Sequence, residues 1–168
     1  MEASILASPP VSGSVEEEWF DAAVPSTWVR FDLDDGSSWV GVFGDGPVFA
    51  EDKSLAVRLG ETSAFLVVAD GLAYLVDARS RKLIARDDHI DWHSAVVLPD
   101  RPLAVLAGFT NLIAFDPSGV VWRSDRVALD GIKLVSARKG CVYGKVYWDD
   151  YAWHDFALDT GTWELTRE

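Results

Sequence analysis

Cysteine is almost absent from this sequence, since Cys141 is the single one in 168 residues. An intramolecular disulfide needs two cysteines, and a multi-cysteine zinc site needs more, so both are excluded. A chain that cannot form a disulfide is typical of a reducing compartment, and we expect a cytoplasmic protein.

Long hydrophobic runs are also missing. No apolar stretch approaches the about 20 residues that a membrane-spanning helix needs. The beginning of the sequence has no basic residues ahead of its short apolar run, residues 5–7, and so does not resemble a secretory signal. The sequence therefore predicts a protein that does not bind a membrane.

Basic residues are few compared with acidic ones. The chain has 15 Lys and Arg against 27 Asp and Glu, and a formal net charge of −12. Such a surface repels the phosphates of nucleic acids, so we expect no nucleic-acid partner. A basic protein is the partner that this charge favours.

Motifs of phosphate binding and nucleophilic catalysis are lacking. Neither GxxxxGK[ST] nor GxGxxG occurs in the sequence, and a G-x-S-x-G nucleophile elbow is missing too. One alternative nucleophile arrangement, Cys141 with His154 and Asp155, can be written down, but Cys141 lies in an apolar segment typical of a buried thiol. The sequence thus favours a protein that is not an enzyme.

Aromatic residues, in contrast, are abundant, with eight Trp and eight Phe. Side chains of this size either fill a core or form a binding surface. The clearest local pattern is at residues 112–126, LIAFDPSGVVWRSDR, where two apolar runs flank the turn residues Asp116 to Gly119. Similar alternations follow one another along the chain, and no window sustains a helical period. We predict an all-β protein made of antiparallel hairpins.

The predicted organisation is a leader segment at residues 1–24 and a single β-domain at residues 25–168. Ser, Pro and Gly dominate much of the leader, and three glutamates precede Trp19 and Phe20, which could attach it as an edge strand or a short helical turn. Within the domain, residues 48–59 are expected to hold a short pair of strands.

An internal repeat organises the predicted hairpins. Asp34, Asp77, Asp116 and Asp159 each follow an apolar strand, at intervals of 43, 39 and 43 residues. Three of the four turns are followed by glycine and then tryptophan: Gly36 and Trp39, Gly119 and Trp122, Gly161 and Trp163. A period of about 40 residues with four strands is typical of propeller blades. We expect the three tryptophans to occupy equivalent, largely buried positions.

The segments FDPSGVVW and ALDTGTWEL, and more loosely DLDDGSSW, resemble the repeats of quinoprotein-type (PQQ-like) β-propellers. The resemblance implies about four propeller-like repeats. The quinoprotein enzymes have eight blades around their cofactor, so no cofactor is expected here. The C-terminal stretch WRSDRVALDGIKLVSARKGCVYGKVYWDD also resembles a group of uncharacterised bacterial proteins, which implies no function.

Four repeats leave the closure of the fold open. The alternatives are a small four-bladed ring, a half-propeller that closes as a homo-oligomer, and an open array or β-sandwich.

A metal site is considered at the polar segment 86–94. His89, Asp91 and His93 have side chains that ligate divalent metals. In a strand, however, the two histidines would stand about 13 Å apart, at about 3.3 Å per residue. We expect a solvated loop and no bound metal.

A second candidate site combines aromatic and acidic residues near one hairpin end. Tyr and Trp dominate the energetics of protein interfaces, and carboxylates attract a basic partner. The predicted binding residues are Tyr147, Trp148, Asp149, Asp150, Tyr151 and Trp153.

These features predict a non-catalytic, acidic protein–protein interaction module, either an immunity-like protein or a regulatory partner of a basic protein. Two alternatives stay open. One is a small enzyme or ligand binder whose site is built from hairpin loops, and the other is a structural β-domain that works as an oligomer.

Overall fold

The computed structural model describes residues 1–11, 13–44, 54–89 and 91–167, and in these ranges it is all-β, without a helix. The predicted fold class is therefore confirmed. Turn residues separate short apolar or alternating segments, and this pattern produces many short strands. The strands in the described ranges are β1 (Glu2–Leu6), β2 (Glu17–Trp19), β3 (Pro25–Asp32), β4 (Ser38–Gly44), β5 (Leu55–Arg58), β6 (Ala64–Ala69), β7 (Leu72–Asp77), β8 (Lys82–Asp87), β9 (Ser94–Val97), β10 (Ala104–Ala107), β11 (Leu112–Asp116), β12 (Gly119–Arg123), β13 (Ile132–Arg138), β14 (Cys141–Tyr147), β15 (Trp153–Asp159) and β16 (Glu164–Arg167).

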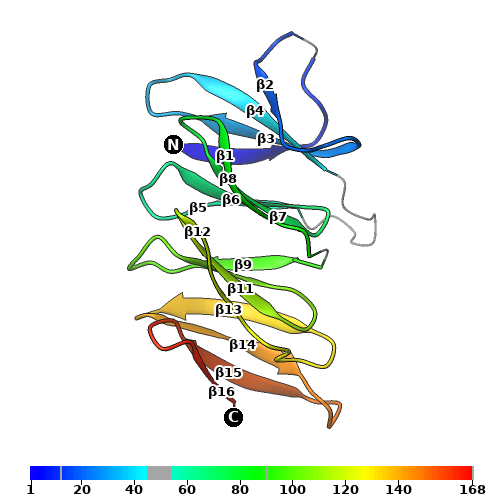
Figure 1. Cartoon of the computed structure of the whole chain (residues 1–168), viewed down its shortest axis with the longest axis vertical. Helices are drawn as coiled ribbons and strands as arrows, with labels where there is room; N and C mark the ends of the chain where they lie inside the picture. The colour runs from blue at the N-terminus through cyan, green and yellow to red at the C-terminus, as the bar shows by residue number, and fades with distance from the viewer. Residues whose placement is uncertain (12, 45–53, 90, 168) are drawn as a thin grey trace. The chain divides into compact units, whose positions relative to one another are not determined.

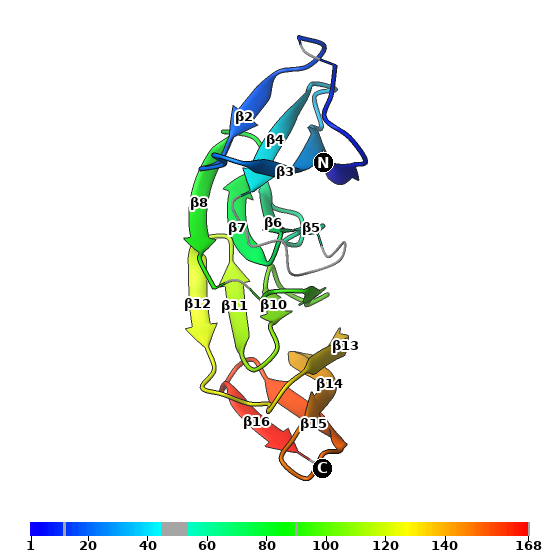
Figure 2. The same ribbon diagram turned by 90° about the vertical axis from the view of Figure 1, so that its right-hand side faces the viewer.

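The strands form four sheets of four strands each (Figure 1). Three sheets are antiparallel meanders that follow the chain, β5 to β8, β9 to β12 and β13 to β16. Figure 2 shows β8, β7, β6 and β5 beside one another in this order. Four consecutive strands in a meander are what a propeller blade contains. Among the described residues, no helix is long and apolar enough for a membrane span.

The first sheet departs from the meander, with the order β1-β3-β4-β2. Strand β1 pairs with β3 in antiparallel register, so that Ile5 lies opposite Val29. Strand β2 is an edge strand and runs parallel to β4. Directly after it, Phe20 is buried and its ring stacks on Phe43 at 5.0 Å. The segment expected as a leader thus contributes two strands, because its backbone pairs with β3 and β4 and its aromatic residue enters the core.

The chain divides into two compact units, where we expected one β-domain. The first unit comprises Met1–Arg58 and Ser63–Ile90, and the second comprises Leu59–Thr62 and Asp91–Glu168. Each unit holds two sheets that share one core, which is the way in which two blades bury their apolar faces. Of the predicted strand pair at residues 48–59, β5 is observed, and residues 48–53 lie outside the described part of the chain.

The cores of the two units differ in composition. Aromatic rings dominate the first core, where Phe31 stacks on Trp39 at 4.5 Å and meets Phe65 edge-on at 5.4 Å. The second core is mainly aliphatic, with side chains of β10, β11, β14 and β15 around the ring of Phe156, and Phe115 and Trp92 are also buried in this unit. Part of the aromatic content therefore fills a core, as its abundance suggested.

The turn aspartates relate the two units to each other in sequence. Asp34 and Asp116 are 82 residues apart, as are Asp77 and Asp159. Strands β3 and β4 flank the turn at Asp34, as β11 and β12 flank the turn at Asp116. In the same way, β7 and β8 flank the turn at Asp77, and β15 and β16 flank the turn at Asp159. Two repeats of about 40 residues therefore make up one unit.

The repeat tryptophans are not equally buried, contrary to our expectation. Trp39 is completely buried, whereas Trp122 and Trp163 are half-buried and stack on each other at 4.7 Å. In the first unit the place of Trp163 is taken by Arg81, whose guanidinium lies over the Trp39 ring at 5.8 Å. The physical reason is that Phe20 and Phe31 pack against the Trp39 ring, whereas Trp122 lies on β12, an edge strand of its sheet.

Candidate functional site

The predicted binding residues come together at the tip of the hairpin between β14 and β15, the orange segment in Figure 1. Tyr147 and Trp153 lie opposite each other in register, with their ring centroids 5.6 Å apart. Two backbone hydrogen bonds close the tip, from Tyr151 N to Trp148 O and from Trp148 N to Ala152 O, both 3.1 Å. Residues 148–152 therefore form a short loop held by the hairpin, which we call the hairpin tip.

The aromatic residues of this region differ in exposure. Tyr151 is 78% exposed and Trp153 is 41% exposed, whereas Tyr147 and Trp148 are half-buried. Large exposed aromatic side chains on a rigid hairpin are typical of binding surfaces, because little conformational entropy is lost when a partner covers them. Tyr151 and Trp153 are therefore the residues with the most surface to offer.

Two cations of the chain already lie on tryptophan rings in this region. The Lys133 ammonium is 4.2 Å from the centroid of Trp153, and the Arg167 guanidinium is 3.9 Å from that of Trp148. Arg167 also donates a hydrogen bond to the carbonyl of Val127 at 3.1 Å. Since aromatic faces attract cations, these contacts hold both rings in place. They also indicate that the aromatic faces of this surface favour cationic groups.

The carboxylates of the region are exposed and only partly paired. Asp150 accepts a hydrogen bond from His154 Nε2 at 2.8 Å, and this bond, with help from the Ala152 amide, lowers the pKa of Asp150 below its usual value. Asp155 pairs with Lys145 at 2.7 Å. Asp149 is exposed and makes no ion pair with a described residue. The hairpin tip thus carries two exposed carboxylates, of which Asp149 makes no ion pair with a described residue.

Sequence reasoning missed the apolar surroundings of the hairpin tip. Trp153 packs on Gly131, where an added Cβ would lie 3.0 Å from the indole Cη2. Gly131 N donates to Phe109 O, and Leu129 N donates to Tyr147 O, both at 2.7 Å. Phe109 is 46% exposed and Leu129 is 36% exposed. These two residues come from other segments, and the only sequence signal was an aromatic residue within the turn composition of residues 108–111.

The structure does not gather the candidate metal ligands. The two ring nitrogens of His93 contact backbone carbonyls, Nδ1 at 3.0 Å from Asp91 O and Nε2 at 3.1 Å from Ile132 O. In the described ranges, no group of three or more His, Cys, Asp or Glu residues is placed to hold a metal ion.

Strand register separates the residues of the alternative nucleophile arrangement. Cys141 lies opposite Asp159, whereas His154 lies opposite Val146, five positions further along β14. At about 3.3 Å per residue, this offset places His154 roughly 16 Å along the strand from the thiol. Cys141, His154 and Asp155 therefore cannot act together on one substrate atom.

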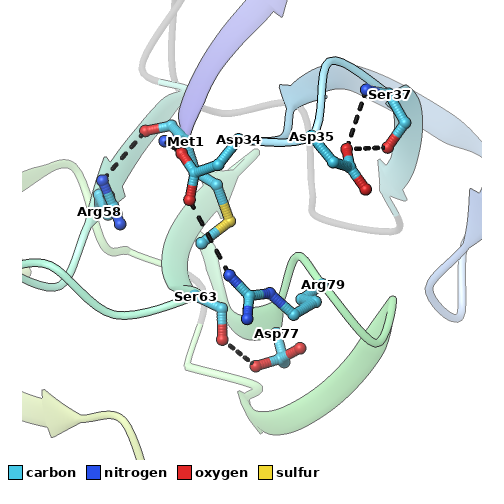
Figure 3. Close-up of polar contacts among 8 residues, drawn as sticks. All are labelled: Met1, Asp34, Asp35, Ser37, Arg58, Ser63, Asp77 and Arg79. Atoms are coloured by element: carbon cyan, nitrogen blue, oxygen red, sulfur yellow. Dashed lines mark hydrogen bonds and ion pairs between the residues drawn. The ribbon is translucent and has the colours of Figure 1, made fainter.

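A second polar cluster lies in the first unit (Figure 3). A hollow is lined by Met1, Leu33, Asp34, Asp35 and Arg79. Asp34 pairs there with the amino group of Met1 and, at 3.9 Å, with Arg79. The hydrogen bond from that amino group lowers the pKa of Asp34 below its usual range.

Turn capping explains the other carboxylates of this cluster. Asp35 accepts hydrogen bonds from Ser37 Oγ and Ser37 N, which lower its pKa. The cap of the first repeat is therefore Asp35 and not Asp34, the residue that the repeat alignment selected. Carboxylates that are held ionised in this way are poor general acids near neutral pH, so this cluster favours a structural role.

Asp77, in the second repeat, yields a prediction for pH dependence. Burial raises its pKa, but hydrogen bonds from Ser63 Oγ and from Ser80 N (2.6 Å) outweigh this effect, so its pKa lies below the ordinary 3.8. A lowered pKa in the folded state stabilises the fold above the unfolded pKa, and this contribution disappears as the pH falls through the folded value.

We expect Asp77→Asn to lower the free energy of unfolding by about 1 kcal/mol at pH 7, and the difference from the natural protein to shrink towards pH 3. Urea denaturation at several pH values measures this. Asp149→Asn is the control, because the Asp149 carboxylate makes no hydrogen bond or ion pair with a described residue. A difference for Asp77→Asn that stays constant down to pH 3 would contradict the role of the charge.

No family model matches the chain, and no curated protein matches it either.

Proposed function

We propose that this chain is a non-catalytic protein-interaction module whose hairpin tip, with Tyr147 and Trp153 at its base, binds a basic protein. The observation that carries the proposal is the exposure of Tyr151 (78%) and Trp153 (41%) beside the exposed carboxylates of Asp149 and Asp150. Aromatic anchors supply the binding energy of an interface, and the carboxylates around them select a partner of opposite charge.

The charge of the whole chain supports the same partner. A formal net charge of −12 attracts a basic protein over a distance set by salt, with a Debye length of about 10 Å at 0.1 M and about 3 Å at 1 M. An immunity-like protein or a regulatory subunit works in this way, by covering a basic surface without chemistry of its own.

The proposal is tested by capturing partners on the immobilised chain and measuring the kinetics with each purified partner. We expect a basic protein whose association slows as salt rises. Replacing Asp149 and Asp150 by Asn should lower mainly the association rate, because exposed charges steer encounter. Trp153→Ala should raise mainly the dissociation rate, because buried anchors set the lifetime of a complex.

The matched control is Val135→Ala, a change at an exposed apolar residue of β13. It should leave both rates unaltered. Partners that bind the natural chain and the Asp149→Asn, Asp150→Asn, Trp153→Ala triple variant equally well would contradict the proposal.

A further inference from the structure

Tyr151 combines an unfavourable backbone conformation with almost complete exposure. Its φ is 61°, in the left-handed region that side chains with a Cβ rarely adopt. Glycine or asparagine is the usual choice at such a position in a tight turn. A bulky aromatic residue is kept there only if something offsets the strain.

Of the three other long or aromatic side chains with positive φ in the described ranges, Lys139 (φ 48°) is exposed at a turn, and the other two show what can offset the strain. Arg81 has a φ of 56° and places its guanidinium over the buried Trp39 ring. Trp163 has a φ of 61° and stacks on Trp122 with 7° between the ring planes. In both cases the side chain gains a contact inside its own unit. Tyr151 has the strain, but its ring contacts no aromatic ring or cation of the described residues.

The neighbouring rings indicate what is missing on Tyr151. In the described part of the chain, cations lie over Tyr74, Tyr143, Trp148 and Trp153 at 3.9 to 5.4 Å from the ring centroids. Of these rings, Trp148 and Trp153 flank Tyr151 along the hairpin, and Asp149, which makes no ion pair with a described residue, precedes Tyr151 by two residues in the hairpin tip. An aromatic face next to a carboxylate is a binding place for a lysine or arginine side chain.

We propose that Tyr151 is the anchor of the interface and receives a lysine or arginine side chain of the partner, held between its ring and the carboxylate of Asp149. The inference rests on the proposed function and names the group that is recognised. The partly exposed apolar residues around Gly131, namely Trp153, Leu129 and Phe109, extend the surface near the hairpin tip and offer a contact to an apolar side chain next to the basic one.

Two measurements on the full chain test the inference. The first is the stability of Tyr151→Gly, which removes the strain and the ring together. If the residue is kept for binding, Tyr151→Gly should raise the urea midpoint of unfolding, because glycine adopts positive φ without cost. An unchanged or lower midpoint would overturn the inference, because Tyr151 would then stabilise its own hairpin.

The second measurement uses two probes, the acetylated and amidated peptides Gly-Arg-Leu-Gly and Gly-Glu-Leu-Gly, titrated into chain with isotope-labelled tyrosine rings. The arginine peptide should shift the ring resonances of Tyr151, and the glutamate peptide should not. Tyr151→Ala should weaken binding of the arginine peptide at least about tenfold, the loss typical of an interface anchor. Val135→Ala should bind it normally.

The remaining outcomes separate the two proposals. If the arginine peptide binds elsewhere and leaves Tyr151 unshifted, the inference is wrong and the basic-partner proposal stands. If it does not bind at all, the inference is overturned too, while the partner-capture experiment still decides the proposed function. Insertion of Tyr151 and Trp153 into neutral phosphatidylcholine vesicles, with no shift from the arginine peptide, would assign the surface to a membrane instead.

Discussion

Replacing Trp39 by alanine should lower the free energy of unfolding by about 3 to 5 kcal/mol, the range for large aromatic side chains in a core. Trp39 is completely inaccessible, stacks on Phe31 at 4.5 Å and lies 6.2 Å from Phe20. Its Nε1 also donates a hydrogen bond to Ala78 O at 2.9 Å, which joins the first sheet to the second. The substitution removes a core ring and a link between sheets at once.

Urea denaturation followed by far-ultraviolet circular dichroism measures this loss. Trp39→Phe separates the two contributions, since it retains a ring and loses the hydrogen bond, which is worth about 1 kcal/mol. The matched control is Trp122→Ala, where a half-buried ring should cost only about 1 to 2 kcal/mol. Equal losses for Trp39→Ala and Trp122→Ala would contradict the difference in burial.

The second large effect is expected at Gly144, in the middle of β14. An added Cβ would lie 2.5 Å from Phe156 Cε1 and closer still to the carbonyl oxygen of Lys133. Because that oxygen belongs to the backbone of β13, it cannot move without disturbing the sheet. The register of β13 and β14 shifts between Leu134 and Ser136, beside this close approach.

Gly144→Ala should therefore destabilise the fold by about 1 to 3 kcal/mol, although alanine is otherwise the smallest change possible. Gly161→Ala serves as the control, because Gly161 is exposed and an added Cβ there would meet only the carboxylate of Asp159, at 3.2 Å. Urea midpoints of the two variants measure the difference. A Gly144→Ala protein as stable as Gly161→Ala would mean that β13 and β14 do not approach so closely.

The fold class could be predicted from the sequence because the residue pattern that forms each hairpin is local. Alternating apolar residues and turn residues such as Asp70 and Gly71, with φ values of 48° and 85°, define each hairpin within about ten residues. The hairpin turns at residues 77, 116 and 159 lie where the repeat placed them. Local pattern could not determine the role of residues 1–24, because pairing of β1 with β3 joins segments more than 20 residues apart.

The candidate site, too, could be predicted from the sequence only in part. Sequence identified the hairpin tip, since its aromatic and acidic residues are contiguous, and the structure brings Tyr147 and Trp153 together as opposite partners. The sequence could not show that the cations of Lys133 and Arg167 lie over two of the tryptophan rings. Nor could it show that Phe109 and Leu129 lie nearby. These contacts come from segments far along the chain, and no periodicity encodes them.

What the sequence by itself determined is therefore the all-β class, the hairpin turns of the repeat, the acidic charge and the position of the aromatic hairpin tip. Only the tertiary structure decided which rings are exposed. Trp39, Trp122 and Trp163 follow similar turns, yet one is buried and two are half-buried, because Phe20 and Phe31 from other segments pack against Trp39. Tyr151 is 78% exposed, in the loop between β14 and β15 and outside both strands.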